Sequence, residues 1–322
     1  MLSKFFGKVV QTDVYKHTLK SDFIEIDVID YGCIITAVRV KTKNGDLKNV
    51  VLGYNTLDEY ISDQDYLGAV IGRFSNRIEN GRFTLNGKTY QTTRNEGAHS
   101  LHGGINGFNT KVWKVAEKSA NSIQFERISP DGEEGFPANL YVSVTYTVSG
   151  GELQIDYCAS SDADTVVSLT NHSYFNLDGV DEDLSGASLY INADYITQTD
   201  KELIPHGEFF EVKSTCCDFK VPAPVKRKLF GDNVVAKRGF FDDNFVLNGK
   251  GFRKVATLFG KELNMDVFTD REGLQVYSEK DNAVALEAQN FPNAVNCPNF
   301  PNAILKKGDI YRAKTIYKFY NK

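Results

Sequence analysis

The alternation of apolar and polar residues constrains the fold of this chain more than any other feature. In FIEIDVI (23–29), Ile24, Ile26 and Val28 alternate with Glu25 and Asp27. The segments YVSVTYTV (141–148) and LQIDY (153–157) show the same period of two. Successive side chains of an extended strand point to opposite faces, so this period predicts β-strands with one buried face.

Turn dipeptides separate the predicted strands. Asn44-Gly45, Asn86-Gly87, Asp131-Gly132, Gly150-Gly151 and Asn248-Gly249 can adopt positive φ at little cost. The segment YTVSGGELQIDY (146–157) is therefore predicted to be a hairpin, and DEYISDQDYLGAVIG (58–72) is the best short helical candidate. Many short strands with frequent turns predict an all-β fold, a large antiparallel sandwich. No linker divides the chain, so we expect residues 1–322 to form a single domain.

Composition narrows the class of function. The chain has 322 residues, 41% of them hydrophobic, and a formal net charge of −5 with dispersed Lys and Arg. Such a charge argues against nucleic acid as a partner and is compatible with a small polar molecule such as a sugar. We expect no signal peptide and no membrane partner, because no sufficiently long apolar segment occurs. The five cysteines form no C-x-x-C pair, which favours a cytoplasmic protein with free thiols.

Several catalytic motifs match only in part. GRFTLNGKT (81–89) has five residues between Gly81 and Gly87, whereas a phosphate-binding loop needs four, and its pattern is strand–turn–strand. His99 and His102 form an H-x-x-H pair without a third ligand nearby, so we expect no metal. No G-x-S-x-G nucleophile motif occurs.

Six polar segments are the remaining candidates for a site. Each residue also has a structural interpretation, as a turn, a cap, a loop brace or a solvent-facing side chain. Glu287 is the least ordinary, because a carboxylate between small apolar residues is either ion-paired or shifted in pKa. The candidates outside the histidine segment are Asn76, Arg77, His102, Asp242, Gln275 and Glu287.

The sixth segment, LTNHSYFNLDG (169–179), contains His172. On an extended strand, His172, Tyr174 and Asn176 would share one face, while Phe175 and Leu177 would lie on the other. Taken alone, His172 fits a buried, hydrogen-bonded histidine about as well as a catalytic one.

Taken together and in order, these segments resemble the aldose 1-epimerase (galactose mutarotase) family. GRFSNRIENGRFTLNGKTYQ, HSLHGGINGF, NHSYFNLDG, FDDNFVL and LEAQNFPNAVNCPNFP are similar to that family's motifs. The likeness extends from about residue 30 to the C-terminus. Three residues depart from the family pattern: His99 stands for Asn, Asp243 for His and Ala288 for Thr.

The resemblance implies a galactose mutarotase-like β-sandwich that interconverts the α and β anomers of aldohexoses without a cofactor. It assigns His172 as general acid and Glu287 as general base. It places Asn76, Arg77, His102, Tyr174, Asp242 and Gln275 at substrate-binding positions. The expected partner is a small aldohexose, and the expected assembly is a monomer or weak dimer.

The chemistry agrees with these residue types. Mutarotation needs one proton removed from the C1 hydroxyl and one delivered to the ring oxygen, and His and Glu both exchange protons. Two alternatives stay open. A hexose-6-phosphate mutarotase would need further Arg or Lys around the sugar, where Arg77 is the clear arginine. A non-catalytic sugar-binding module would be expected to lack His172 or Glu287.

Overall fold

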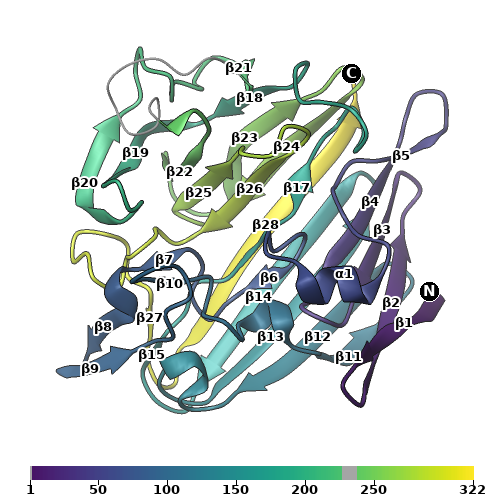
Figure 1. Cartoon of the computed structure of the whole chain (residues 1–322). Coiled ribbons are helices and arrows are strands. Elements are labelled where there is room, and N and C mark those ends of the chain that lie inside the picture. Colours follow the sequence, from purple (N-terminus) through teal and green to yellow (C-terminus); the bar gives the residue numbers. More distant parts are fainter. Residues whose placement is uncertain (1, 227–237) are drawn as a thin grey trace.

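Antiparallel β-strands make up most of the protein (Figure 1). The structure, a computed structural model, describes residues 2–226 and 238–322. Three large sheets contain five, nine and six strands, and neighbouring strands within each of them run antiparallel. The all-β sandwich expected from the alternating sequence is confirmed.

The strands of the three sheets are as follows, in spatial order. The five-stranded sheet contains β1 (Leu2–Val9), β2 (Thr12–Lys20), β3 (Ile24–Ile29), β4 (Ile35–Lys41) and β5 (Leu47–Asn49). The nine-stranded sheet contains β11 (Lys114–Lys118), β12 (Ser122–Ser129), β13 (Leu140–Ser149), β14 (Glu152–Ser161), β28 (Ile310–Asn321), β24 (Leu263–Thr269), β23 (Arg253–Phe259), β18 (Ser188–Ile191) and β21 (Ala223–Pro224). The six-stranded sheet contains β17 (Tyr174–Phe175), β26 (Val284–Gln289), β25 (Gly273–Tyr277), β22 (Asp242–Leu247), β19 (Ala193–Thr199) and β20 (Pro205–Glu211).

Short paired strands and one short helix connect the sheets. The pairs are β6 (Val70–Ile71) with β16 (Thr170–Asn171), β7 (Arg77–Ile78) with β10 (Ser100–Leu101), β8 (Arg82–Leu85) with β9 (Lys88–Gln91), and β15 (Thr165–Val166) with β27 (Ile304–Leu305). Helix α1 (Leu57–Ser62) overlaps only the beginning of the predicted helical segment 58–72, and Thr56 and Glu59 form a capping box at its start. Across the part of the chain that the structure describes, no helix is long and apolar enough to cross a bilayer.

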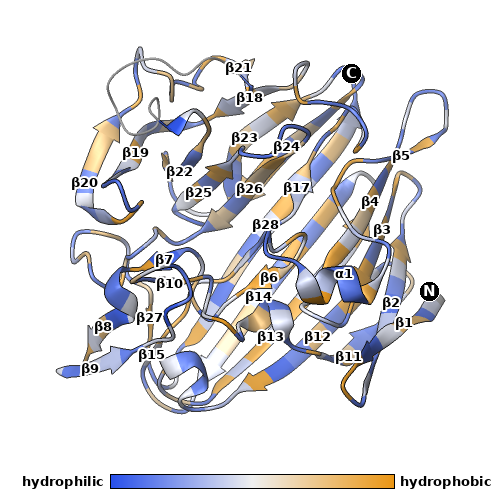
Figure 2. Cartoon of the chain, in the orientation of Figure 1, coloured by the Kyte–Doolittle hydropathy of each residue, from blue (hydrophilic) through white to orange (hydrophobic). Residues whose placement is uncertain are grey.

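One continuous apolar core joins the three sheets. It includes Ile26 of β3, Val144 of β13 and Leu286 of β26, all fully buried. Two tyrosines of the nine-stranded sheet also hydrogen-bond across the layers: Tyr317 donates to the carbonyl of Leu286 and Tyr146 to that of Cys33. Figure 2 shows the alternation of apolar and polar residues along the long strands that face this core. Burial of each large apolar side chain contributes about 1.5–3 kcal/mol to folding.

The predicted turns lie where expected. Gly150 has φ 52° in the turn between β13 and β14, which confirms the hairpin. Asn86 and Gly87 have φ of 51° and 76° and join β8 to β9. The segment GRFTLNGKT is therefore a hairpin and not a phosphate-binding loop.

Candidate active site

The six-stranded sheet presents an ordered set of polar side chains on its face away from the main core. Asp242 of β22 pairs in register with Tyr277 of β25, which pairs with Ala285 of β26, which in turn pairs with Tyr174 of β17. In the next row, Gln275 pairs with Glu287. Because paired residues share a face, strand register brings together side chains that are more than 100 positions apart in the sequence.

His172 lies opposite Glu287. His172 precedes β17 in the sequence, and its Nε2 is 3.5 Å from Glu287 Oε1. Both side chains are almost completely buried, with 4% and 1% exposed. The His172 ring also lies 4.9 Å from the Tyr174 ring and 5.3 Å from the His102 ring, centroid to centroid. Strand alternation had already placed His172 and Tyr174 on one face.

Burial controls the proton affinities of this pair. Desolvation lowers the pKa of His172 from 6.5 to about 4. Desolvation, with the nearby negative charge of Asp242, raises the pKa of Glu287 well above its usual 4.5. Both directions favour the neutral form of each group.

Arg77 and His102 reach the site from two loops that are tied together. Leu101 of β10 pairs with Arg77 of β7, and this pairing holds the two loops side by side. Gly103, with φ 89°, follows His102, and a Cβ at Gly103 would lie 2.0 Å from the carbonyl oxygen of Gly72. The glycine after His102 therefore permits a close approach of two backbones.

The backbone of Asn76 determines which nitrogen of His102 is protonated. The backbone N–H of Asn76 donates to His102 Nδ1 at 3.2 Å, so Nδ1 is unprotonated. Burial, with the nearby His172 and Arg77, lowers the pKa of His102 well below 6.5. His102 is therefore neutral and carries its proton on Nε2, which makes it a hydrogen-bond donor from that atom.

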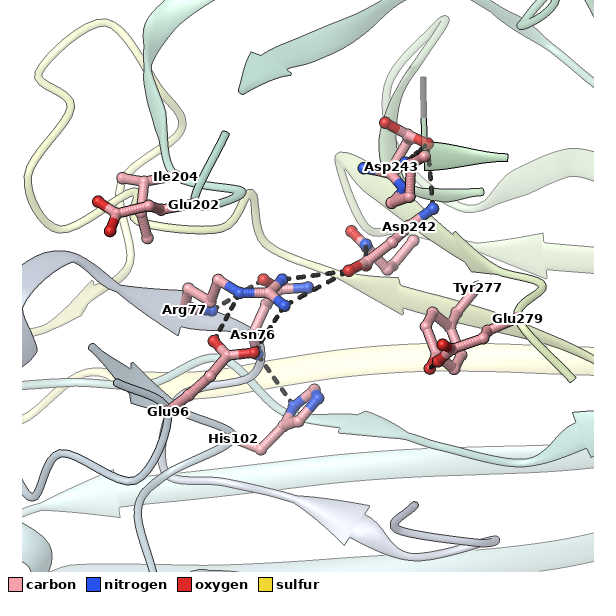
Figure 3. Close-up of polar contacts among 12 residues, drawn as sticks. Asn76, Arg77, Glu96, His102, Glu202, Ile204, Asp242, Asp243, Tyr277 and Glu279 are labelled. Atoms are coloured by element: carbon pink, nitrogen blue, oxygen red, sulfur yellow. Dashed lines mark hydrogen bonds and ion pairs between the residues drawn. The ribbon is translucent and has the colours of Figure 1, made fainter. Parts of the chain in front are cut away.

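Arg77 is held in a chain of charged hydrogen bonds (Figure 3). Its Nε and Nη2 donate to the two oxygens of Glu96 at 2.7 and 2.8 Å. Its Nη1 and Nη2 both lie 3.4 Å from Asp242 Oδ2, and Gln275 Nε2 donates to Asp242 Oδ1 at 2.6 Å. A bidentate guanidinium–carboxylate pair fixes both distance and orientation, so Glu96 determines where Arg77 points.

The acidic pair Asp242–Asp243 divides into two roles. Asp242 faces the cavity, while Asp243 is buried behind it and its Oδ2 accepts hydrogen bonds from Arg238 Nη2 and from the backbone N–H of Asp242. Burial raises the pKa of Asp243 to about 6 despite the Arg238 guanidinium. The side chain that replaces the family's histidine thus supports Asp242 from behind.

These groups surround a cavity of about 260 Å³. The sequence-predicted residues Asn76, Arg77, His102, His172, Tyr174, Asp242 and Glu287 line it. Gln275 does not line the cavity. It is buried below Asp242, and its direct contact with a substrate stays a prediction.

Other residues of the histidine segment have structural roles. Asn176 donates to the carbonyls of Glu182 and Asn282 and does not line the cavity, although alternation had placed it on the face of His172. Phe175 and Leu177 lie in the main core, as expected for the opposite face.

Sequence reasoning missed several cavity residues. The polar ones are Gln64, Asp65, Glu96 and Glu279, and the aromatic ones include Tyr66, Phe240 and Tyr277. Glu96 lies in RNEGAHS, where no alternating pattern or motif marks it; its only signal is proximity to the H-x-x-H pair.

The H-x-x-H pair does not form a joint site. His99 Nδ1 accepts a hydrogen bond from the backbone N–H of Asn80, and its Nε2 lies 3.8 Å from Glu202 Oε2, whereas His102 lines the cavity. Within residues 2–226 and 238–322, no group of three or more His, Cys, Asp or Glu side chains is arranged to hold a metal ion.

Comparison with known families matches this chain to one of them. The sequence model described as aldose 1-epimerase matches residues 15–318. The chain belongs to the aldose 1-epimerase family. Galactose mutarotase of Sus scrofa is 40% identical over 326 residues, covering 95% of this chain and 94% of that protein. Aldose 1-epimerase of Haemophilus influenzae is 36% identical over 261 residues, covering 79% and 75%.

Solved structures of this family share the fold. An aldose epimerase homologue from C. elegans superposes with a TM-score of 0.86 at 26% identity, covering 95% of this chain and 99% of that one. Galactose 1-epimerase from Lactobacillus acidophilus superposes with a TM-score of 0.88 at 24% identity, covering 99% and 98%. The likeness therefore extends over the whole sandwich.

Proposed function

We propose that this chain is an aldose 1-epimerase that interconverts the α and β anomers of aldohexoses such as D-galactose and D-glucose. The observation that carries the proposal is the buried His172–Glu287 pair, 3.5 Å apart at the bottom of a polar cavity. A pair that shares one proton can remove a proton at one sugar oxygen and deliver a proton to another. Family membership agrees with this activity.

The proposed reaction uses the one proton that His172 and Glu287 share. Sugar hydroxyls near Glu287 stabilise its carboxylate, and the proton moves to His172. Glu287 then takes the proton of the C1 hydroxyl while His172 gives its proton to the ring oxygen. The C1–O5 bond breaks, the C1 carbonyl forms, and O5 becomes a hydroxyl. After rotation about C1–C2, the two transfers reverse and the ring closes on the other face of the carbonyl.

The remaining cavity groups suit a neutral polyol. His102 donates from Nε2, Arg77 donates from its guanidinium, and Asp242 accepts. Sites that bind particular hydroxyls disfavour sugars that lack them, because buried partners are then left unpaired. In our proposal, Asn76 and Tyr174 contribute further contacts, and Gln275 acts through Asp242.

We also propose that the enzyme is cytoplasmic and works as a monomer or weak dimer. The cavity draws its lining from strands and loops of one chain, so no partner chain is needed to complete the proposed pair. Size-exclusion chromatography with light scattering over a range of concentrations would measure the assembly.

Two rival activities make different demands on the cavity. A hexose 6-phosphate carries a dianion, and the cavity lining has Arg77 as its cation, already paired with Glu96 and Asp242. We therefore expect rates on free hexoses to exceed those on glucose 6-phosphate. A non-catalytic sugar-binding module would bind galactose without changing the rate of mutarotation.

The test of the proposal is removal of either member of the pair. His172→Ala and Glu287→Ala should each lower kcat for α-D-galactose by about 10²–10⁴-fold. Polarimetry of freshly dissolved sugar, corrected for spontaneous mutarotation, measures the rate. His206→Ala is a matched control, because His206 is exposed and lies outside the cavity lining. Wild-type rates in both pair variants would disprove the assignment.

A further inference from the structure

A second polar cluster extends from Glu287, which lines the cavity, to residues that lie outside the cavity lining. The sheet register places Asn244 opposite Gln275 and Gln275 opposite Glu287, with Gly273 opposite Gln289 one step along. Asn244, Gln275, Glu287 and Gln289 therefore share one face of the six-stranded sheet around Gly273. These four side chains are 0–3% exposed.

Six polar atoms of this cluster have no hydrogen-bond partner among the described residues. They are Asn244 Nδ2 and Oδ1, Gln275 Oε1, Glu287 Oε2, and Gln289 Nε2 and Oε1. Buried polar atoms are paired in the large majority of cases, and ordered water satisfies those that the protein does not. Six unpaired atoms lie on one small area of the sheet, and they include both polar ends of two amides. These atoms require ordered water as a partner.

Gly273 has no side chain on this face, and the Asn244 amide packs directly against it: a Cβ built there would lie 2.2 Å from Asn244 Oδ1 and 3.1 Å from the Phe291 ring. The amides of Asn244 and Gln289 carry both donors and acceptors, which is the requirement for binding a water molecule at two to four points. Neither amide lines the substrate cavity.

We propose that Asn244, Gln275 and Gln289 hold ordered water between their side chains, that this water donates a hydrogen bond to Glu287 Oε2, and that Asn244 and Gln289 are thereby positioning residues for the base. The inference rests on the proposed mutarotase function for its kinetic consequence. It assigns the buried oxygen of Glu287 to water and leaves Oε1, the oxygen facing His172, for the reaction.

The charges around Glu287 explain why this water matters. Asp242 opposes ionisation of Glu287, Arg77 favours it and is already paired with Glu96 and Asp242, and His172 faces Oε1. A donor at Oε2 stabilises the carboxylate over the carboxylic acid. Loss of that donor should make the ionised base rarer at neutral pH.

A crystal structure of the wild-type protein at a resolution that defines water is the direct test. Electron density for water within hydrogen-bond distance of Glu287 Oε2 and of Asn244 or Gln289 is expected. Direct pairing of the amides with each other or with Glu287, without water, would overturn the inference. This test is independent of activity, so it stands even if the wild-type enzyme fails to catalyse mutarotation, an outcome that would instead disprove the proposed function.

Kinetics test the consequence. Gln289→Met keeps the length of the side chain and removes its polar atoms, and it should lower kcat at neutral pH roughly tenfold and move the alkaline limb of the kcat profile to higher pH. KM should stay within about twofold of wild type. Asn244→Leu should act in the same direction, and Asn244→Ser, which keeps a hydroxyl and leaves room for water, should retain more kcat than Asn244→Leu.

Asn264→Leu is the control for the loss of a buried amide. Asn264 lies on β24 in the other sheet layer and also has an unpartnered oxygen. Its kinetics should equal those of the wild type. A wild-type pH profile in Gln289→Met and Asn244→Leu, both shown to be folded by circular dichroism, would overturn the positioning role.

Discussion

The two ends of the cavity differ in how completely their polar groups are paired. At the Arg77 end, the guanidinium donates to both oxygens of Glu96 and reaches Asp242, whose other oxygen accepts from Gln275. At the other end, His172 Nδ1 and Glu287 Oε2 have no partner among the described residues. The distance between His172 and Glu287, 3.5 Å, is longer than a well-formed hydrogen bond.

In the proposed mechanism, this difference separates the residues that bind the sugar from those that transfer protons. Charged groups in a complete network keep their charge and geometry, so they can hold sugar hydroxyls in place. Buried groups with few partners are easily protonated or deprotonated, because desolvation brings their charged and neutral forms closer in energy. Burial lowers the pKa of His172 and raises that of Glu287, so the loosely paired end is suited to proton transfer.

The pH profile should show the strongest effect of this contrast. In the proposed mechanism, activity requires one proton on the His172–Glu287 pair. Because the pKa of His172 is lowered to about 4, the pair gains a second proton only below that pH, and kcat/KM should fall about tenfold per pH unit there. Because the pKa of Glu287 is raised, the alkaline limb should lie well above pH 4.5. Polarimetry across pH, corrected for acid and base catalysis by the buffer, measures both limbs.

His102 is the control for the acid limb. Its pKa is also lowered well below 6.5, so its protonation could add to the same limb. His102→Asn should leave the position of the limb unchanged while weakening sugar binding. An acid limb near pH 6.5 in the wild-type enzyme would contradict the pKa direction assigned to His172.

Substitutions at the Arg77 end of the cavity should alter sugar binding (KM) instead of turnover (kcat). Glu96→Gln replaces one of the two carboxylate oxygens that hold Arg77, so the guanidinium loses its bidentate partner. We expect KM for galactose to rise about tenfold, the equivalent of one charge-assisted hydrogen bond, with kcat within about threefold. Initial rates over a range of galactose concentrations separate the two constants.

Glu202→Gln is the matched control for Glu96→Gln. Glu202 is an exposed acid that lies apart from the Arg77 network in Figure 3, and its substitution should leave both constants unchanged. A fall in kcat without a rise in KM for Glu96→Gln would show that Arg77 acts in proton transfer instead of binding.

Most of the fold was predictable from local pattern. Alternation in FIEIDVI and YVSVTYTV identifies strands β3 and β13, and Gly150 identifies the following turn, because one buried face and one positive φ leave few alternatives. Which strands become neighbours was not predictable in this way. The β14–β28 pair joins segments about 150 residues apart, and local periodicity carries no information about that pairing.

The site was predictable only where motifs marked it. His172, Glu287 and Arg77 belong to segments that resemble family motifs, and each lines the cavity. Glu96 and Asn244 could not be found in the same manner, because their importance depends on a partner across a sheet or a loop. Alternation also failed at Asn176, since the strand β17 ends at Phe175 and Asn176 turns to backbone carbonyls beyond it.

The smallest effect is expected where the chain departs from the family pattern at His99. His99 Nδ1 accepts from the backbone N–H of Asn80 at 3.0 Å, and an Asn side-chain oxygen can accept the same hydrogen bond. His99→Asn also removes Nε2, which is buried without a hydrogen-bond partner among the described residues and lies 3.8 Å from Glu202 Oε2. Both constants for galactose should therefore stay within about twofold of wild type, and the thermal unfolding midpoint within about 2 °C. A tenfold change in KM would instead place His99 in the recognition network with its neighbour His102.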